Sequence, residues 1–500
     1  MIALLALALV ATSFLLQAHI DLNLIDEGYL WYGAIAVTKG QVPIRDFASY
    51  DPARYYWVAA WLRLLDRGII PVRIACAVFN AGGILCGLLV VRRLTRSWWV
   101  LAAVGALLTL WLFPAFMLNH TIALAAVYVA VLLIERPSLA RHLLAGAFVG
   151  FATFFARNLG LYALVSFGAL IVLIWWKLDP RDLTRRGLAW GAGIVLGYAP
   201  ALVMFAVVPG FWTATVSAAR DIVERGTTNL ARPIPWPWTE PSLWGVAVGA
   251  FFVLVPLCYA LLAGWIAAAS GDALRRRAVL VAATMTGIPY LQYAFSRADI
   301  EHLAMSIHPF LLALVALPFG VSRRWRAPAA ALVAAVAGVS LVAVGEVSPF
   351  YQRATAPAGY YVPTRLGRWT IWMPWPEANF IRGTIQFNET MVRSDEGFLV
   401  IPHLGPGLYA LLDRTSPLFQ TYFLFPTPEP RQRQMIAELE RNRVNWILFE
   451  DVRTDGRDEL RFESTHRLMW EYIRTHFDVF PVDGLPPKTT LWRRKTASTS

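Results

Sequence analysis

Charged residues are scarce in this 500-residue sequence, and lysine and cysteine are scarcer still. Only 16% of the residues are charged, whereas an average soluble domain carries about 25%. The three cysteines are too few to form a disulfide framework for a chain of this length. Apolar residues make up 57% of the chain, which also contains 21 Trp. This composition excludes a disordered or disulfide-stapled protein and predicts a membrane protein.

The net charge is +12, and only four of the 45 basic residues are lysines. A basic chain often binds nucleic acid, but in a membrane protein the position of the charge matters more than its sum. We therefore expect no nucleic-acid partner. Biased codon usage is the simpler explanation of the preference for arginine, and selection for bidentate phosphate binding is the alternative.

Long apolar stretches recur along the first 345 residues. A helix needs about 20 apolar residues to cross a bilayer, and we interpret eleven windows as spans. Their approximate limits are 2–19, 70–91, 98–114, 120–134, 141–156, 159–176, 188–208, 243–267, 278–294, 303–321 and 327–345. The first window has no Lys or Arg before it and no convincing cleavage site, so we interpret it as a span and not as a signal peptide. The predicted fold class is a polytopic α-helical membrane protein with about eleven transmembrane helices.

Short loops rich in arginine occupy every second connection between these windows, at 92–96, 135–141, 177–186, 275–277 and 323–326. Cytoplasmic loops carry an excess of Lys and Arg, so the pattern predicts a cytoplasmic N-terminus. With an odd number of spans, the first long loop and everything after the last span would lie outside.

A change of composition divides the chain into two predicted domains. Residues 1–345 would form the transmembrane domain, whose first outer loop, 20–69, carries two amphipathic helices with Tyr and Trp residues that would suit the membrane interface. Residues 346–500 have more charge and shorter apolar runs, with strand-like segments such as 397–402 and 445–449. They predict a small extracytoplasmic α/β domain with about three strands.

Ionisable and polar residues gather at the outer ends of the spans. Charges near hydrocarbon are costly and usually face a bundle interior or a cavity, so we interpret four such turns as parts of one site at the outer face. Ordinary polarity at a water interface is the simpler alternative for any single turn. The residues that carry the prediction are Asp26, Glu27, His120, Arg157, Arg297, Asp299 and His302.

These residue types suit the transfer of a group from a phosphate. Asp26 and Glu27 begin a predicted helix, where a carboxylate would cap the helix or take a proton from an acceptor hydroxyl. Arg157, Arg297 and His302 would bind a phosphate or pyrophosphate and stabilise the charge of the leaving group. The sequence contains no His-Glu-x-x-His motif, Walker loop or dinucleotide fingerprint. We expect no metal site and no required cofactor.

The first outer loop carries an ordered series of short motifs. They are Asp26-Glu27-Gly28-Tyr29, then Ala36-x-x-x-Gly40-x-x-Pro43-x-x-Asp46-Phe47, then Tyr50-Asp51-Pro52 and Tyr55-Tyr56. This order resembles the polytopic GT-C glycosyltransferases, which include protein O-mannosyltransferases and the aminoarabinose transferase of lipid A. Two later motifs look like recurrent elements of bacterial members, Arg157-Asn158-x-Gly160-x-Tyr162 and Ser296-Arg297-Ala298-Asp299-x-x-His302.

The resemblance implies a glycosyltransferase of the bacterial inner membrane that takes a sugar from a polyprenyl phosphate and has its active site and C-terminal domain on the periplasmic side. Asp26 would be the catalytic base, with Glu27 the next candidate. The groups that bind the donor phosphate would be Arg157, Arg297 and His302. Further candidates for contacts with donor or acceptor are Asp46, Tyr55, His120 and Asp299. The outer turn 114–120 has no carboxylate where metal-dependent relatives have a second acidic motif, which argues against a required divalent metal.

Two other classes of protein remain alternatives. A transporter or lipid flippase would also place arginines and carboxylates in the membrane, but the sequence shows neither repeated halves nor clearly broken helices. An envelope scaffold whose C-terminal domain recruits a partner is the second alternative. The acceptor stays open, because protein, lipopolysaccharide, capsule and carrier lipid all present hydroxyl groups.

Overall fold

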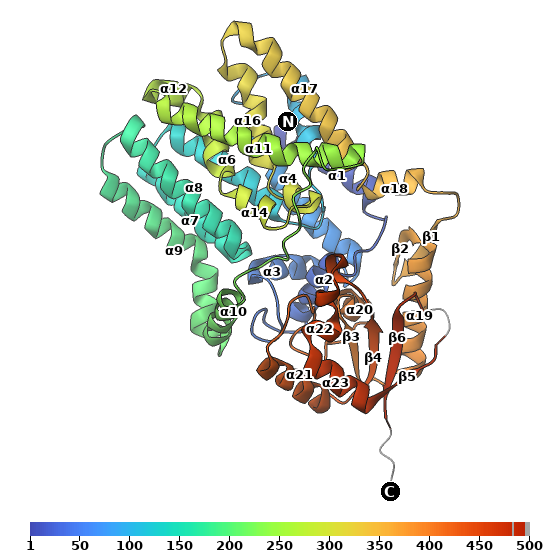
Figure 1. The fold of residues 1–500 in the computed structure, drawn as a ribbon. Helices are drawn as coiled ribbons and strands as arrows, with labels where there is room; N and C mark the ends of the chain where they lie inside the picture. Colours follow the sequence, from blue (N-terminus) through green and yellow to red (C-terminus); the bar gives the residue numbers. More distant parts are fainter. Residues whose placement is uncertain (483–484, 496–500) are drawn as a thin grey trace. The chain divides into compact units, whose positions relative to one another are not determined.

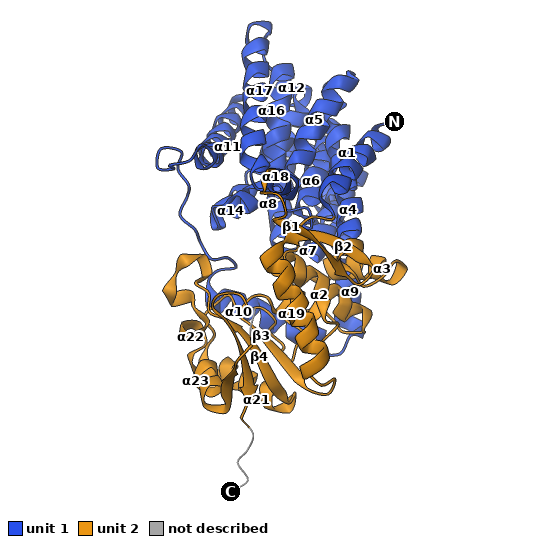
Figure 2. Cartoon of the chain, turned by 90° about the vertical axis from the view of Figure 1, so that its right-hand side faces the viewer, with its two compact units in different colours: residues 1–18, 73–354 blue, residues 19–72, 355–500 orange. Residues whose placement is uncertain are grey.

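The computed structural model describes residues 1–482 and 485–495. The chain forms two compact units (Figure 2), and each consists of two separate stretches of sequence. Unit 1 contains Met1–Ala18 and Arg73–Ala354, and unit 2 contains His19–Val72 and Thr355–Ser500. We describe each unit by itself.

This grouping differs from the predicted division at 345/346 in one main respect. The first outer loop, which we placed with the spans, packs in unit 2 together with the C-terminal part of the chain. The physical reason is that its first helix buries ten of its thirteen residues, including an aromatic face that the C-terminal part covers. Sequence alone does not show this partner, because it lies more than 300 residues further along the chain.

Unit 1 consists almost entirely of helices, coloured from blue through yellow in Figure 1. The helices are α1 (Ile2–Gln17), α4 (Ile69–Val91, whose first turn belongs to unit 2), α5 (Trp98–Leu110), α6 (Asn119–Glu135), α7 (Leu139–Phe155), α8 (Arg157–Leu173) with the π-helical turn η1 (Ile174–Leu178), α9 (Leu183–Val207), α10 (Phe211–Arg225), α11 (Leu243–Ala268), α12 (Gly271–Arg276), α13 (Ala278–Gly287), α14 (Tyr290–Ser296), α15 (Ile300–Ala304), α16 (His308–Gly320), α17 (Arg323–Gly345) and α18 (Pro349–Thr355).

Nine of the eleven predicted windows each fall mainly on one helix; window 278–294 covers the bent pair α13 and α14, and window 303–321 covers the end of α15 and all of α16. Five helices are long and apolar enough to cross a membrane, and the bent pair would make a sixth. The other predicted windows correspond to apolar helices of 10–17 residues. The chain is therefore a multi-pass membrane protein, and the number of spans beyond these stays a prediction.

Glycines allow α7 and α9 to pack with their backbones in contact. Two pairs, each spaced by four residues, face each other along this contact: Gly146 with Gly150, and Gly193 with Gly197. A Cβ at any of the four positions would approach a backbone oxygen of the opposite helix to between 1.9 and 2.3 Å. Helices in membranes commonly associate through such small residues, since lipid provides no hydrophobic force to drive them together.

We expect Gly193→Leu to lower the midpoint of thermal unfolding in detergent, because the new side chain would overlap the backbone of α7. Overpacking of this kind costs about 1–3 kcal/mol. Gly191→Leu in the same helix is the matched control, since a Cβ there meets nothing within 4 Å. Equal midpoints for the two variants would contradict the tight α7–α9 contact.

Unit 2 combines the first outer loop with a small α/β region. Its elements are α2 (Asp26–Thr38), α3 (Pro52–Leu64), β1 (Tyr361–Leu366), β2 (Trp369–Pro374), α19 (Trp375–Met391), β3 (Gly397–Ile401), α20 (Gly405–Leu411), α21 (Glu429–Arg441), β4 (Val444–Glu450), the 3-10 turns η2 (Thr454–Gly456) and η3 (Asp458–Leu460), α22 (Phe462–Thr465), α23 (Arg467–His476), β5 (Phe477–Phe480) and β6 (Thr489–Arg494).

The main sheet of unit 2 has the strand order β3-β4-β6-β5. Strands β3 and β4 are parallel, with Leu399 opposite Ile447, and β6 is antiparallel to both β4 and β5. The predicted strands at 397–402 and 445–449 are confirmed as β3 and β4, and β6 and β5 complete the sheet. The hairpin of β1 and β2 lies before the predicted strand segments, in a part of the chain rich in Pro, Trp and Tyr for which the sequence analysis names no strand.

The two predicted helices of the first outer loop are confirmed as α2 and α3, but the interfacial role predicted for their aromatic residues is wrong for the larger part of α2. Trp31 and Tyr32 are each 3% exposed. The indole of Trp31 donates to Arg67 O at 2.7 Å, and the hydroxyl of Tyr32 accepts from Ser416 N at 3.0 Å. These side chains are core residues of unit 2.

Candidate functional site

Three predicted site residues of unit 1 form one hydrogen-bonded group. Asp299 accepts from Arg297 Nε at 2.9 Å and from the ring nitrogen Nδ1 of His302 at 2.8 Å. It also accepts from the backbone N–H of His302 at 3.0 Å and so caps α15. All three side chains are less than 20% exposed. Burial raises the pKa of Asp299, but the bonds from His302 and the charge of Arg297 outweigh burial, so the pKa lies below its usual value.

The segment 209–242, which contains α10 and leads into α11, also contacts this group. The carbonyl of Leu230 accepts from Arg297 Nη1 at 3.1 Å, and Arg232 approaches Asp299 to 3.8 Å. Asn229 donates to Ser296 Oγ at 2.8 Å. The segment therefore supplies a second guanidinium beside the Asp299 carboxylate.

Tyr293 connects three of the outer turns that we expected to share a site. Its ring packs on that of His302, with centroids 5.2 Å apart, and its hydroxyl accepts from Asn119 Nδ2 at 3.2 Å. The rings of Tyr293 and Tyr162 lie edge to face, with centroids 6.4 Å apart, and Tyr162 hydrogen-bonds to Asn158. The turns at the starts of α6 and α8 and the segment 290–302 are thus brought together within unit 1, and their joint role as one site stays a prediction.

The two remaining predicted residues of unit 1 differ in their surroundings. Arg157 is the first residue of α8, directly before Asn158. His120 is fully buried in the helical core, where its ring packs edge-on against His308 at 5.2 Å and its Nε2 faces Pro114 O at 3.4 Å. The His120 side chain therefore has a partner in the core that the sequence did not suggest.

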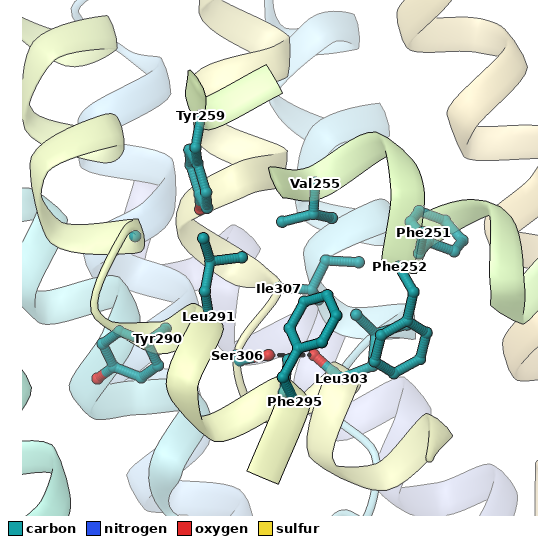
Figure 3. Close-up of a pocket in the computed structure, with 12 residues that line it drawn as sticks. Phe251, Phe252, Val255, Tyr259, Tyr290, Leu291, Phe295, Leu303, Ser306 and Ile307 are labelled. Atoms are coloured by element: carbon teal, nitrogen blue, oxygen red, sulfur yellow. Dashed lines mark hydrogen bonds between the residues drawn. The ribbon is translucent and has the colours of Figure 1, made fainter. Parts of the chain in front are cut away.

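A break between α13 and α14 sets the direction of α14, the helix that carries Tyr293. The two helices meet at 41° around the Gly287-Ile288-Pro289 sequence. A Cβ at Gly287 would lie 2.0 Å from the hydroxyl of Tyr259, so a side chain at this position would require Tyr259 to move. Figure 3 shows the apolar pocket at this break, with Tyr259 above Leu291 and the rings of Phe252 and Phe295 side by side. The sequence showed no clearly broken helix, and this bend corrects that expectation.

The candidate base Asp26 lies in unit 2, at the start of α2. Asn23 Oδ1 accepts from the backbone N–H groups of both Ile25 and Asp26 at 2.9 Å. Asn23 thereby satisfies donors that the first turn of a helix leaves without partners. Glu27 is only 2% exposed, whereas Asp26 is half-buried. Of the two carboxylates, Asp26 has the better access to a substrate.

Asp46 and Tyr55, the other predicted residues of unit 2, both brace the loop between α2 and α3. Asp46 accepts from Val42 N at 2.7 Å and from Arg45 Nε at 2.8 Å, and the pairing with Arg45 lowers the pKa of Asp46. Tyr55 is fully buried, and its hydroxyl accepts from Tyr50 N at 3.1 Å. The structure gives each residue a structural role, and their contact with a substrate stays a prediction.

Glu377, in the first turn of α19, was not a candidate in the sequence. Glu377 is exposed at the surface, but partial desolvation of its carboxyl group and the neighbouring carboxyl group of Asp21, to which it is hydrogen-bonded, raise the pKa of Glu377 to about 7 from its usual 4.5. The folded chain therefore keeps this proton at pH values at which the unfolded chain has released it. The stability of unit 2 should fall as the pH rises from about 4.5 to about 7, since the folded state then binds more protons.

We expect Glu377→Gln to remove this pH dependence. The variant should unfold at a higher temperature than the wild type at pH 8, and at a similar temperature at pH 4.5, in thermal unfolding of the full chain in detergent. Glu389→Gln, an exposed residue of the same helix, is the control. If the unfolding temperatures of Glu377→Gln and wild type differed by the same amount at pH 4.5 and at pH 8, the pair of carboxyl groups would not be the cause of the pH dependence.

The candidate residues therefore fall into two groups that we describe separately, one in each unit. Among residues 1–482 and 485–495, no group of three or more His, Cys, Asp or Glu side chains is placed to hold a metal ion.

Sequence reasoning missed Tyr293, because it sits inside an apolar window. The signal that would have found it is the pair of turn-forming residues Gly287 and Pro289 just before it.

No protein-family model and no curated protein sequence matches the chain. Solved structures do match it over nearly its full length. ArnT from Cupriavidus metallidurans bound to undecaprenyl phosphate aligns with 99% of this chain and 98% of its own, with a TM-score of 0.53 and 13% identity. The apo form of the same protein aligns with 97% of each chain, with a TM-score of 0.53 and 14% identity.

A second solved protein with a similar fold is the oligosaccharyltransferase of Archaeoglobus fulgidus tethered with an acceptor peptide. It aligns with 98% of this chain and 74% of its own, with a TM-score of 0.50 and 11% identity. Both proteins are GT-C glycosyltransferases. The chain has the GT-C fold, and the resemblance seen in the first outer loop is confirmed at the level of the fold.

Proposed function

We propose that the protein is a membrane glycosyltransferase that moves a sugar from a polyprenyl-phosphate donor to a hydroxyl group of an acceptor at the outer face of a bacterial inner membrane. The observation that carries the proposal is the fold likeness across the whole chain to ArnT, which was solved with undecaprenyl phosphate. The grouped charges of Arg297, Asp299 and His302 support it, because fold alone does not define an activity.

On the donor side, the proposal assigns phosphate binding to Arg297 and His302, together with Arg157. Asp299 fixes Arg297 through Nε and fixes His302 through Nδ1, so both side chains are oriented before a substrate binds. Charge-assisted hydrogen bonds to phosphate are roughly twice as strong as neutral ones. They would stabilise the negative charge that develops on the polyprenyl phosphate as it leaves.

On the acceptor side, the proposal assigns the role of general base to Asp26. The acceptor oxygen attacks the anomeric carbon, and its proton passes to the Asp26 carboxylate. The bond between the anomeric carbon and the phosphate oxygen breaks, and its electron pair leaves with the polyprenyl phosphate. A single displacement with one base inverts the anomeric configuration. No step requires a metal ion, and we propose that none is needed.

We expect Asp26→Asn to lower transfer by about 10²–10⁴-fold, the usual contribution of a general base. The measurement is transfer of radiolabelled sugar from a panel of undecaprenyl-phosphate sugars by detergent-purified protein, with envelope extract as acceptor. Glu27→Gln tests the second carboxylate in the same assay, and Asp395→Asn is the control, because Asp395 is an exposed residue of unit 2. Normal transfer by Asp26→Asn would refute its assignment as the base.

We expect Arg297→Gln to raise the KM for the donor by about 10–100-fold, since a hydrogen bond to a charged group contributes about 1.5–3 kcal/mol. Arg297→Lys should recover only part of the loss, because lysine lacks the planar fork of arginine. Arg220→Gln is the control, an exposed arginine on α10 that pairs with Glu224. An unchanged donor KM in Arg297→Gln would remove this residue from the donor site.

A transporter or flippase is the second candidate, and the break between α13 and α14 favours it. Discontinuous helices often mark substrate sites in transporters. Movement of a fluorescent polyprenyl-phosphate sugar across proteoliposomes without any sugar transfer would support this candidate. Transfer that depends on Asp26 would support the enzyme.

A further inference from the structure

We propose that the C-terminal part of the chain positions the catalytic carboxylate, and that Gly407 on α20 and Asn23 before α2 are the positioning residues. The proposal rests on the assignment of Asp26 as the base. The proposal assigns a role to the Gly405-Pro406-Gly407 sequence, which by its residue types resembles an ordinary turn.

The first step of the argument is a direct backbone bond between α20 and the segment that leads into α2. The N–H of Gly407 donates to the carbonyl of Leu24 at 2.9 Å. Leu24 lies two residues before Asp26. This hydrogen bond therefore connects the C-terminal part of unit 2 to the backbone immediately before the candidate base.

The second step is that no side chain fits at this contact. A Cβ at Gly407 would lie 2.5 Å from both Cα and O of Leu24. A Cβ at Gly28 would lie 2.6 Å from Cα and N of Gly407. Real Cβ atoms do not approach backbone atoms this closely, so a methyl group at either position must move one backbone away from the other.

The third step is the clamp that Asn23 places on the same turn. Its side-chain oxygen accepts from the N–H groups of Ile25 and Asp26, both at 2.9 Å, and its backbone carbonyl accepts from Gly28 N at 2.9 Å. Asn23 therefore accepts hydrogen bonds from backbone N–H groups before, at and after Asp26. The backbone of Asp26 is fixed by Asn23, and the segment around it is fixed by Gly407.

The fourth step links this turn to the sheet. One turn beyond Gly28, the ring of Tyr32 packs on Tyr409 of α20 with centroids 5.8 Å apart. The hydroxyl of Tyr409 accepts from Val400 N of β3 at 2.9 Å. Strand β3, α20 and α2 therefore form a continuous packed support within unit 2.

The geometry of a helix then directs the Asp26 carboxylate away from this support. Residues two apart on an α-helix point to different faces, so Asp26 does not share the face on which Gly28 touches α20. The support can fix the base without covering it. A catalytic group displaced by about 1 Å can lose about 10²-fold in rate, so loss of the support should affect the chemical step and not the binding of the donor.

The test compares Gly407→Ala with Gly383→Ala in the full-length protein. Gly383 lies on α19 of the same unit, and a Cβ there meets nothing within 4 Å. Gly407→Ala should lower kcat by about 10–100-fold with the donor KM within about twofold of wild type, using whichever undecaprenyl-phosphate sugar the wild type transfers. Gly383→Ala should leave both constants unchanged. Normal kcat in Gly407→Ala would overturn the proposal.

Asn23 provides a second variant with a conservative rescue. Asn23→Ala removes the acceptor for two N–H groups and should lower kcat, while Asn23→Asp keeps a side-chain oxygen at that place and should restore it. Equal losses in both variants would show that the side-chain acceptor is not what matters, and would overturn the role of Asn23.

Amide hydrogen exchange separates this proposal from the proposed function, because it needs no enzymatic activity. The peptide that covers residues 23–30 should exchange faster in Gly407→Ala than in wild type, and at the wild-type rate in Gly383→Ala. Unchanged exchange in Gly407→Ala would overturn the support. If the support is present but Asp26→Asn transfers sugar normally, the assignment of the base fails and the structural contact stands.

Discussion

The backbone contact between Gly407 and the residues that lead into α2 is the constraint on which unit 2 depends. It joins two stretches of chain that lie on either side of nearly all of unit 1 in sequence. Because the contact is made by backbone atoms, it fixes the separation of α2 and α20 more strictly than side-chain packing would. The buried tyrosines on both helices extend the contact and satisfy their hydroxyl groups with backbone N–H donors.

In unit 1, a cluster of polar groups is held among apolar helices. Asp299 accepts hydrogen bonds from the side chains of Arg297 and His302 and caps a helix at the same time, so its charge is stabilised within the group. Tyr293 offers an apolar ring to His302 and a hydroxyl to Asn119, which suits a boundary between polar and apolar surroundings. The polar cluster is thereby assembled from turns that are far apart in sequence.

The sequence predicted the helical windows correctly because hydrophobicity is a local property of each segment. The group of Arg297, Asp299 and His302 could also be predicted, since all three lie within six consecutive residues. The hairpin of β1 and β2 could not, because its prolines and aromatic residues are equally typical of an irregular linker.

Other parts of the site depend on long-range packing that one sequence does not reveal. The aromatic face of α2 resembles an interfacial helix until its partner α20 is known. The close approach of Gly287 to the side chain of Tyr259, which comes from another helix, is likewise not visible in the sequence. The structural role of Asp46 follows from a loop conformation that its residue type alone does not determine.

The discontinuity of unit 2 has a consequence for biosynthesis. Segment 19–72 leaves the ribosome early, but its partners in β3 and α20 are made only after all of unit 1. At about 5–20 residues per second, the segment must wait for tens of seconds before Tyr409 of α20 can pack on Tyr32. Unit 2 can therefore complete its core only at the end of translation, and a nascent chain that stops before α20 presents an aromatic surface for chaperones and proteases to recognise.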